Sequence, residues 1–259
     1  RRSYAKMFSA SLTYVLIVVP ISVALGLGSA LLISSLRIGN ELYKAIFFLP
    51  VMATLLAMAI VWEFALNPIM GVVNDILRSG CDKRLIYGFF TGAWYGADPL
   101  QSWYGTACAD KFPIWLGDKR YALGTIAFIG IWQGFGFNMV LYLAGLTSVP
   151  RELYQAAHMD GADSAWERFK LVTWPMLGPT HVFVITISSI RSFQVFDTVE
   201  ALTEGGPSKS TYVMVYAMFE KGVRQNLLGI GSAITIVFLA FVLVLTLIQV
   251  YFVNRRVHY

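Results

Sequence analysis

The chain has 259 residues, of which 57% are hydrophobic and only 14% are charged, and its formal net charge is +5. This composition excludes an ordinary soluble domain and is typical of a polytopic membrane protein. The basic residues are scattered over all the polar segments, so the net charge does not indicate nucleic-acid binding.

Five long stretches without Asp, Glu, Lys or Arg predict the membrane spans. A span needs roughly 20 apolar residues, and each stretch can hold one. We therefore expect an all-α fold, a polytopic transmembrane helix bundle that forms a single domain over residues 1–259. The five transmembrane helices are expected near residues 9–35, 43–65, 121–146, 179–202 and 229–253.

Residues 66–120 form the one large region between predicted spans, and they contain both cysteines, Cys81 and Cys108. The run at 87–96 is rich in aromatic residues and glycine, which indicates a compact lobe that prefers the membrane interface. If the region is extracytoplasmic, its compartment permits a disulfide between the two cysteines. Two unrelated thiols are the alternative.

The third predicted helix carries two glycines four residues apart, Gly130 and Gly134. Small residues at this spacing let helices approach closely, and lining a pocket is the other role they can have. Gln133 and Asn138 are polar side chains on the same helix. Each can hydrogen-bond either a neighbouring helix or a hydroxyl of a passing solute.

Residues 147–178 form a patterned polar segment between two apolar stretches. Pro150 suits the first turn of a helix, Glu152 lies where the helix dipole favours an anion, and Gly161 can take the left-handed conformation that ends a helix. Ser164 and Glu167 have capping-box spacing and begin a second helix. We predict a short helix, a tight glycine corner and a second helix that runs toward Pro175.

The fourth predicted helix ends in charged and polar residues at intervals of three, namely Arg191, Gln194 and Asp197. On a continuous helix these share one face. A charge at membrane depth is costly unless it is paired or faces water, which makes Arg191 a functional candidate. The alternative is a structural ion pair between Arg191 and a carboxylate, either Asp197 or one on a partner subunit. Beyond it, residues from Thr211 onward predict an amphipathic helix at the membrane surface.

The segment Gln155-Ala156-Ala157, followed by Asp160-Gly161-Ala162, resembles the EAA loop of the membrane subunits of ATP-binding-cassette importers. The upstream sequence Trp132-Gln133-Gly134 and the downstream segments 193–197 and 202–207 resemble the carbohydrate branch of these importers, the maltose and glycerol-phosphate permeases. The resemblance spans nearly the whole chain. In two departures, Gln155 replaces the family's usual glutamate, and one extra residue lies between Gly161 and Pro175.

This resemblance implies a permease subunit with the type I importer fold, multi-pass in the bacterial cytoplasmic (inner) membrane, that forms the path for a sugar or sugar-derived solute. The implied partners are a second homologous permease subunit, two ATPase subunits that hold ATP and Mg, and an extracellular or periplasmic solute-binding protein. The resemblance also implies a cytoplasmic coupling loop at 147–178 and an extracytoplasmic loop at 66–120 that contains an insertion relative to similar importers. It further implies one more helix ahead of Arg1. With the loop at 147–178 placed in the cytoplasm, seven Lys and Arg residues lie on the cytoplasmic side and twelve on the other side. This count leaves the orientation in the membrane undecided.

The coupling loop must seat a rigid short helix in a groove of an ATPase subunit, where small alanines permit close approach and polar groups form the rim. The candidate coupling residues are Glu152, Gln155, Ala156, Ala157, Asp160, Gly161 and Arg168. His158 alone is expected to be a solvated loop histidine. From the family motifs and the polar side chains, the candidate solute path comprises Gly130, Gln133, Gly134, Phe137, Asn138, Arg191, Ser192, Gln194 and Val195.

Arg191 favours an anionic solute, such as a uronic-acid oligosaccharide or a glycerol phosphate. We expect no enzyme and no cofactor in this chain, because the sequence has no phosphate-binding loop and its three histidines and two cysteines lack metal-ligand spacing. The alternative function is an ion-coupled secondary transporter of a small polar solute. That class of transporter needs carboxylates that bind the coupling ion within the membrane. Only Asp197 and Glu200 come near this requirement, and both lie near the end of a predicted helix.

Overall fold

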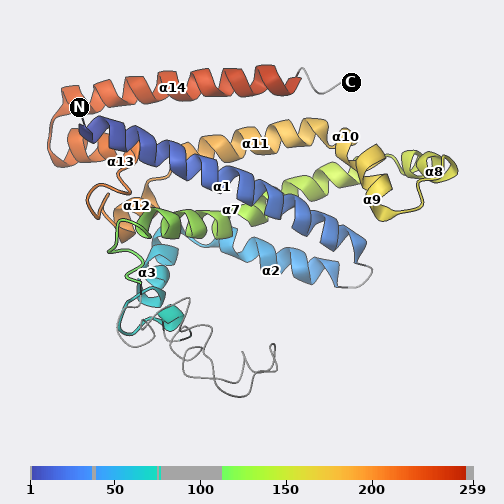
Figure 1. The fold of residues 1–259 in the computed structure, drawn as a ribbon, viewed down its shortest axis with the longest axis horizontal. Coiled ribbons are helices and arrows are strands. Elements are labelled where there is room, and N and C mark those ends of the chain that lie inside the picture. Colours follow the sequence, from blue (N-terminus) through green and yellow to red (C-terminus); the bar gives the residue numbers. More distant parts are fainter. Residues whose placement is uncertain (1, 37–38, 75, 77–112, 255–259) are drawn as a thin grey trace, which may run out of the picture.

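The computed structural model describes residues 2–36, 39–74, 76 and 113–254. The long helices run roughly along the long axis of the molecule (Figure 1), and they are α1 (Arg2–Ser35), α7 (Ala122–Thr147), α11 (Gly178–Phe193) and α14 (Leu228–Asn254). The predicted cysteine pair, Cys81 and Cys108, lies outside the described residues. Four spans of the described residues are long and apolar enough to cross a membrane, and the all-α prediction is confirmed for the described residues. They lie on α1, on α7, on α11 with an extension to Leu202, and on α14.

The second predicted span, at residues 43–65, is broken. The stretch expected as one helix at 43–65 forms α2 (Asn40–Met52) and α3 (Leu55–Ala65), and the axes of the two pieces meet at 96°. The expectation of one continuous helix is therefore wrong. Pro50 lies inside α2 and removes one backbone donor, which weakens the helix locally. Ala53 and Thr54 then take extended backbone conformations, with ψ of 138° at both residues.

The two ends of the bundle are distinct (Figure 1). The end of α1, the start of α2, the end of α14 and the helix α8 (Arg151–Met159) lie toward one end. The short helices α12 (Asp197–Leu202) and α13 (Met214–Phe219) lie toward the other end, near the start of α1. This arrangement matches an odd number of crossings, because α1 begins and α14 finishes at opposite ends.

The core forms where α1 crosses α7 and α11. Ile33 of α1, Met139 and Tyr142 of α7 and Val184 of α11 make one buried apolar cluster. A larger cluster joins α1 and α7 to α13 and α14. These contacts hold α1, α7 and α11 together around the polar residues described below.

The segment from Thr211 onward, expected as an amphipathic helix at the membrane surface, packs against the other helices of the bundle. Thr211, Val213 and Met214 are fully buried, and the backbone N–H of Met214 donates to Ser11 Oγ of α1 at 2.9 Å. Helix α13 is only six residues long and buries Met214, Tyr216 and Ala217 together, so the expectation of an amphipathic helix with a broad polar face is wrong.

Candidate functional site

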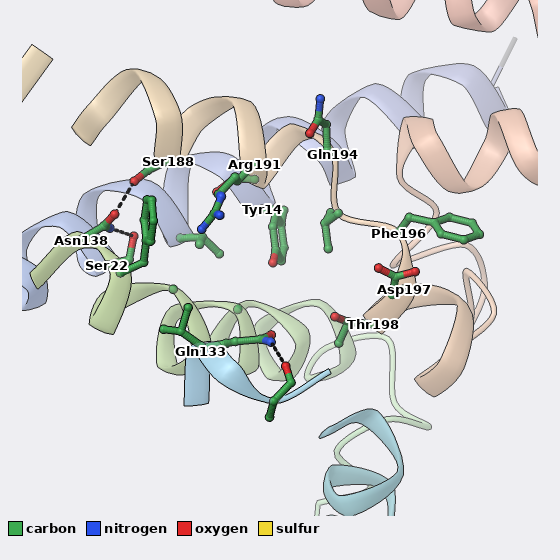
Figure 2. A pocket seen from close by; sticks show the side chains of 18 residues that line it. Tyr14, Ser22, Gln133, Asn138, Ser188, Arg191, Gln194, Phe196, Asp197 and Thr198 are labelled. Atoms are coloured by element: carbon green, nitrogen blue, oxygen red, sulfur yellow. Dashed lines mark hydrogen bonds between the residues drawn. The ribbon is translucent and has the colours of Figure 1, made fainter. Parts of the chain in front are cut away.

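A cavity of about 470 Å³ lies among α1, the end of α2, α7 and α11 (Figure 2). All nine residues that the sequence indicated for the solute path line this cavity. Further lining residues include Tyr14, Val18, Ser22, Val51, Ala53, Ser188, Phe196, Asp197 and Thr198. Its size suits one or two sugar rings, within the usual range for small-molecule sites.

Arg191 is the cation of the cavity. Its guanidinium points from α11 toward α7, with Cζ 4.1 Å from the centre of the Phe137 ring (Figure 2). A guanidinium over a ring face is a favourable cation–π contact that leaves the N–H donors free for an oxygen-rich ligand. No ion pair among the described residues includes Arg191, so the alternative pairing with Asp197 is not formed in this structure.

The predicted row of Arg191, Gln194 and Asp197 on one helix face is wrong. Helix α11 ends at Phe193, and the amide of Gln194 bonds the carbonyls of Ile190 and Arg191 as the helix closes. A new short helix then begins at Asp197. Because the helix is interrupted, Gln194 points away from Arg191, while Asp197 lies farther along the cavity (Figure 2).

The two amide side chains of α7 bond neighbouring helices. Ser188 Oγ of α11 donates to Asn138 Oδ1 at 2.9 Å, and Asn138 Nδ2 donates to Ser22 Oγ of α1 at 3.4 Å. Gln133 Nε2 donates to the carbonyl of Ala53 at 3.5 Å, at the break between α2 and α3. The sequence left two roles open for these amides, a hydrogen bond to a neighbouring helix or to a solute hydroxyl. In the structure both amides bond neighbouring segments, at the edge of the cavity.

The two glycines of α7 have different surroundings. A Cβ at Gly130 would overlap the hydroxyl of Tyr14, whereas a Cβ at Gly134 would meet nothing within 4 Å. Gly130 therefore permits close approach of the Tyr14 side chain, and Gly134 opens onto the cavity. Sequence reasoning missed Tyr14, Ser22 and Ser188, although lone hydroxyls in otherwise apolar spans were a usable signal.

The segment predicted to couple to an ATPase has the predicted local structure. Helix α8 is preceded by Pro150, Gly161 has φ of +90°, and α9 (Ala165–Arg168) starts with a complete capping box. Ser164 Oγ accepts from the Glu167 amide at 3.1 Å, and Glu167 Oε2 accepts from the Ser164 amide at 3.0 Å. Hydrogen bonds from the Ser164 backbone and then its side chain lower the pKa of Glu167 below its ordinary value.

The described loop residues divide into exposed and buried positions. Glu152, Gln155, Ala156, Asp160 and Gly161 are exposed, and Arg168 is half-buried. Ala157 is buried against Val149, Ala162 and Val172, so its expected place on the docking surface is wrong. The two alanines occupy adjacent positions on α8, about 100° apart, which puts only one of them outside.

The exposed side of α8 also carries apolar residues that sequence reasoning missed. Leu153 and Met159 are exposed, and they flank Ala156 at intervals of three. Residues at this spacing share one helix face, which was a signal in the sequence. His158 is exposed as expected, and its Nδ1 lies 3.0 Å from Asp163 Oδ1.

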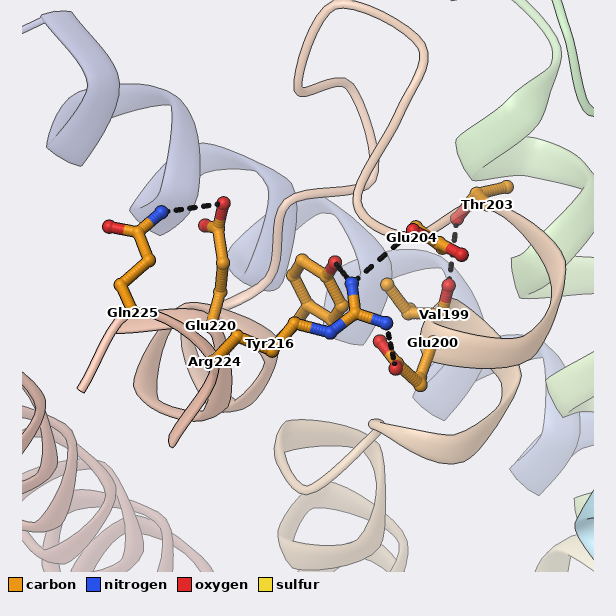
Figure 3. Close-up of polar contacts among 8 residues, drawn as sticks. All are labelled: Val199, Glu200, Thr203, Glu204, Tyr216, Glu220, Arg224 and Gln225. Carbon is orange, nitrogen blue, oxygen red and sulfur yellow. Dashed lines mark hydrogen bonds and ion pairs between the residues drawn. The ribbon is translucent and has the colours of Figure 1, made fainter. Parts of the chain in front are cut away.

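At the opposite end of the bundle, Arg224 is held by two carboxylates (Figure 3). Its Nη2 lies 2.7 Å from Glu200 Oε1, and its Nη1 lies 3.3 Å from Glu204 Oε2 and 3.4 Å from the Tyr216 hydroxyl. These bonds tie α12 to the π-helical turn η3 (Glu220–Arg224), which follows α13. Glu200 therefore has a structural partner.

A family of membrane proteins matches almost the full chain. Residues 2–258 match the family model described as "Binding-protein-dependent transport system inner membrane component". The chain is 29% identical over 256 residues to the sn-glycerol-3-phosphate transport system permease protein UgpA of Brucella abortus biovar 1 (strain 9-941), covering 98% of this chain and 77% of that protein. It is 28% identical over 213 residues to the probable ABC transporter permease protein YurN of Bacillus subtilis (strain 168), covering 82% and 64%.

The fold is similar to that of a bacterial ABC transporter involved in the import of the acidic polysaccharide alginate. The TM-score is 0.78 at 20% sequence identity, and the match covers 98% of this chain and 80% of that chain. The same match is found for that transporter in complex with an alginate pentasaccharide-bound periplasmic protein. At this identity the likeness concerns the fold.

Proposed function

The chain belongs to the binding-protein-dependent transport system inner membrane components, and from this we propose that it is the permease subunit of an ATP-driven importer whose solute path is the cavity around Arg191. The observation that carries the proposal is a polar cavity among helices of a multi-pass membrane protein, connected through α11 to the segment that contains the exposed helix α8. We place the protein in the bacterial inner membrane, with the α8 end in the cytoplasm.

The solute we propose is a sugar or sugar-derived molecule that carries negative charge. Arg191 offers a guanidinium without a carboxylate partner among the described residues, and Ser22, Ser188 and Thr198 line the same cavity with hydroxyls. Guanidinium groups bind carboxylates and phosphates through paired hydrogen bonds. Two similar proteins are named for import of glycerol phosphate and of an acidic polysaccharide, which supports this class.

The energy source we propose is a pair of separate ATPase subunits, with ATP and Mg bound there. The exposed apolar residues Leu153, Ala156 and Met159 of α8 form a face suited to a groove on such a subunit. A second, homologous permease subunit and an extracellular or periplasmic solute-binding protein complete the proposed assembly. The similar structure solved with its periplasmic protein supports the last of these partners.

The rival function, an ion-coupled secondary transporter, has little support among the described residues. Of the two carboxylates considered for ion coupling, Glu200 is bonded to Arg224. Asp197 remains and lines the cavity, where it is exposed. A single exposed carboxylate does not form the enclosed ion site that such carriers build at the membrane midplane.

Substitution of Arg191 by Gln tests the proposed solute. We expect Arg191→Gln to lower uptake of an anionic probe, sn-glycerol 3-phosphate or a uronic-acid oligosaccharide, by about tenfold or more, because a charged hydrogen bond is worth about 1.5–3 kcal/mol. Assembly and ATPase activity should remain. The control is Arg120→Gln, which removes an exposed arginine outside the cavity. Unchanged uptake in Arg191→Gln, or loss of assembly, would make Arg191 structural.

A further inference from the structure

The end of the solute cavity nearer α8 is closed by hydrogen bonds between helices. Asn138 of α7 bonds Ser22 of α1 and Ser188 of α11, and all three residues are buried. Ser22 Oγ also donates to the carbonyl of Val19 at 3.2 Å. Both serines therefore already donate their hydroxyl protons to protein groups, and neither has a proton left for a solute.

Three other hydroxyls of the cavity have no hydrogen-bond partner among the described residues. They belong to Tyr14 of α1, Ser192 of α11 and Thr198 of α12, and these residues are 4%, 8% and 6% exposed. A polar group buried without a partner is costly, so buried hydroxyls are normally bonded. Unpaired hydroxyls that line a cavity are therefore placed to bond a molecule inside it.

The Tyr14 hydroxyl lies near the middle of the cavity. It rests against Gly130 of α7, where any side chain would overlap it. Ser22, at the closed end, follows Tyr14 by eight residues and lies about 12 Å further along α1. In Figure 2 the Tyr14 ring stands between Arg191 and Asp197. A solute that reaches from one of these charges to the other thus passes the Tyr14 hydroxyl.

The two charged residues of the cavity have opposite signs and different depths. Arg191 and Asp197 both line the cavity and are exposed, and the helix is interrupted between them. Because α11 starts at the loop that contains α8, Arg191 lies nearer the closed end and Asp197 lies farther from it (Figure 2). No ion pair among the described residues includes either side chain.

These charges set what each end of the cavity accepts. A guanidinium only donates hydrogen bonds, and it pairs best with a carboxylate or phosphate. The ionised carboxylate of Asp197 only accepts, so a solute hydroxyl can bond it, whereas a second anionic group there would be repelled. The cavity is therefore suited to a solute with unlike ends.

We propose that the solute binds in one orientation, with a single anionic group at Arg191 and an uncharged, hydroxyl-bearing end at Asp197, while Tyr14 bonds a hydroxyl between them. This inference rests on the proposed function and narrows its solute class. It favours a glycerol phosphate, or a saccharide with one terminal uronate, over a chain of uronates. Tyr14 and Asp197 are then residues that determine specificity.

The test is a thermal-shift titration of the assembled membrane complex without ATP or solute-binding protein. A ligand that binds only the folded protein raises its unfolding temperature, and the dependence on ligand concentration gives the affinity. The probes are glucose, glucuronate and glucarate, which have six carbons and carry no carboxylate, one carboxylate and a carboxylate at each end. Wild type should bind glucuronate at least about tenfold more tightly than either of the others, the effect of one charged hydrogen bond.

Two variants test the named residues. Asp197→Asn should strengthen glucarate binding about tenfold, because the repulsion is removed, and should change glucuronate binding much less. Tyr14→Phe should weaken the binding of glucose and glucuronate by the same factor, about two- to tenfold, the effect of one neutral hydrogen bond. The matched controls, Glu63→Gln and Tyr121→Phe, alter exposed residues outside the cavity and should change neither affinity.

The outcomes separate this inference from the proposed function. If wild type binds glucarate as tightly as glucuronate, and both more tightly than glucose, the single orientation is wrong while the anionic solute class stands. This comparison needs no variant. An unchanged ratio in Asp197→Asn, or undiminished binding in Tyr14→Phe, would also overturn the inference. Glucose bound as tightly as glucuronate would contradict both the inference and the proposed anionic solute.

Discussion

Gly130 and Gly134 look alike in the sequence, four residues apart on one helix, yet they have different neighbours. At Gly130 the Tyr14 hydroxyl occupies the space that a side chain would need, while Gly134 faces open cavity. The sequence predicted that both residues belong near the solute path. It did not distinguish a glycine needed for packing from one that widens a cavity, because that difference depends on which residue of another helix lies opposite.

We therefore predict that Gly130→Ala destabilises the protein by about 1–3 kcal/mol, the usual cost of forcing an extra group into a packed site. Gly134→Ala, its matched control on the same helix, should leave stability unchanged. The measurement is thermal unfolding of the purified protein followed by tryptophan fluorescence. In a Tyr14→Phe background the Gly130→Ala penalty should shrink, because the overlapping oxygen is gone. Equal effects of the two alanines would contradict this account.

Ser164 and Glu167 are a case where the sequence alone sufficed, since a capping box is local and needs no tertiary partner. The pKa of Glu167 is lowered in the folded loop, so its contribution to stability is present above the ordinary pKa of glutamate and is lost as pH falls through the lowered value. We predict that Ser164→Ala removes this cap and speeds amide exchange at residues 165–168.

Hydrogen–deuterium exchange measures the effect of the cap, expressed as the ratio of exchange rates in Ser164→Ala and wild type at each pH. The ratio should be largest at neutral pH and should fall in acid, where protonated Glu167 supports the cap less and the bond from the Glu167 backbone amide to Ser164 Oγ remains. A ratio that is independent of pH would show that Glu167 contributes nothing to the start of α9.

At the scale of elements, the positions of four spans and of the helix–corner–helix loop follow from the sequence, because charge gaps and caps are local signals. The breaks do not. The interruption at Ala53 and Thr54 has a visible sign in Pro50, but membrane helices often tolerate proline, and the break is supported by Gln133 from α7. The sequence likewise has no proline or glycine that marks the end of α11 at Phe193, a residue that is buried in the larger apolar cluster.

Helix α8 provides a test of the coupling assignment. We predict that Ala156→Trp lowers co-purification of the ATPase subunit by at least about tenfold, because a bulky ring on the exposed face blocks close docking, consistent with central interface residues contributing 2 kcal/mol or more. His158→Trp is the matched control, exposed on the same helix and about 200° around its axis.

Both variants should keep the elution volume and helix content of the bundle. Ala157→Trp is unsuitable as the test, since Ala157 is buried in the loop's own core and the change would disrupt the loop itself. If His158→Trp reduced ATPase binding as strongly as Ala156→Trp, or if Ala156→Trp retained the ATPase, the docking face would lie elsewhere.

Across the whole molecule, α11 joins the two regions to which we assign function, the loop that contains α8 and the cavity around Arg191. Through η2 (Phe169–Thr173) and α10 (Trp174–Met176), the helix that begins after the capping box leads into α11, which carries Arg191. Arg191 follows Gly178 by 13 residues, so the cavity is about 20 Å along the helix from its loop end. Under the proposed function, a displacement at α8 would reach the cavity as a rigid-body tilt of α11 around a fixed site.

The central claim is that solute crosses through the cavity, driven by ATP hydrolysis on partner subunits. Its most direct test is uptake of labelled sn-glycerol 3-phosphate and a uronic-acid oligosaccharide into proteoliposomes that contain the assembled complex and its solute-binding protein, with wild type and Gly134→Trp compared. We predict uptake that requires ATP, survives collapse of ion gradients, and is abolished by Gly134→Trp, whose ring fills the cavity, while the complex remains assembled. Uptake that persists without ATP and stops when ion gradients collapse, or undiminished uptake in Gly134→Trp, would contradict the claim.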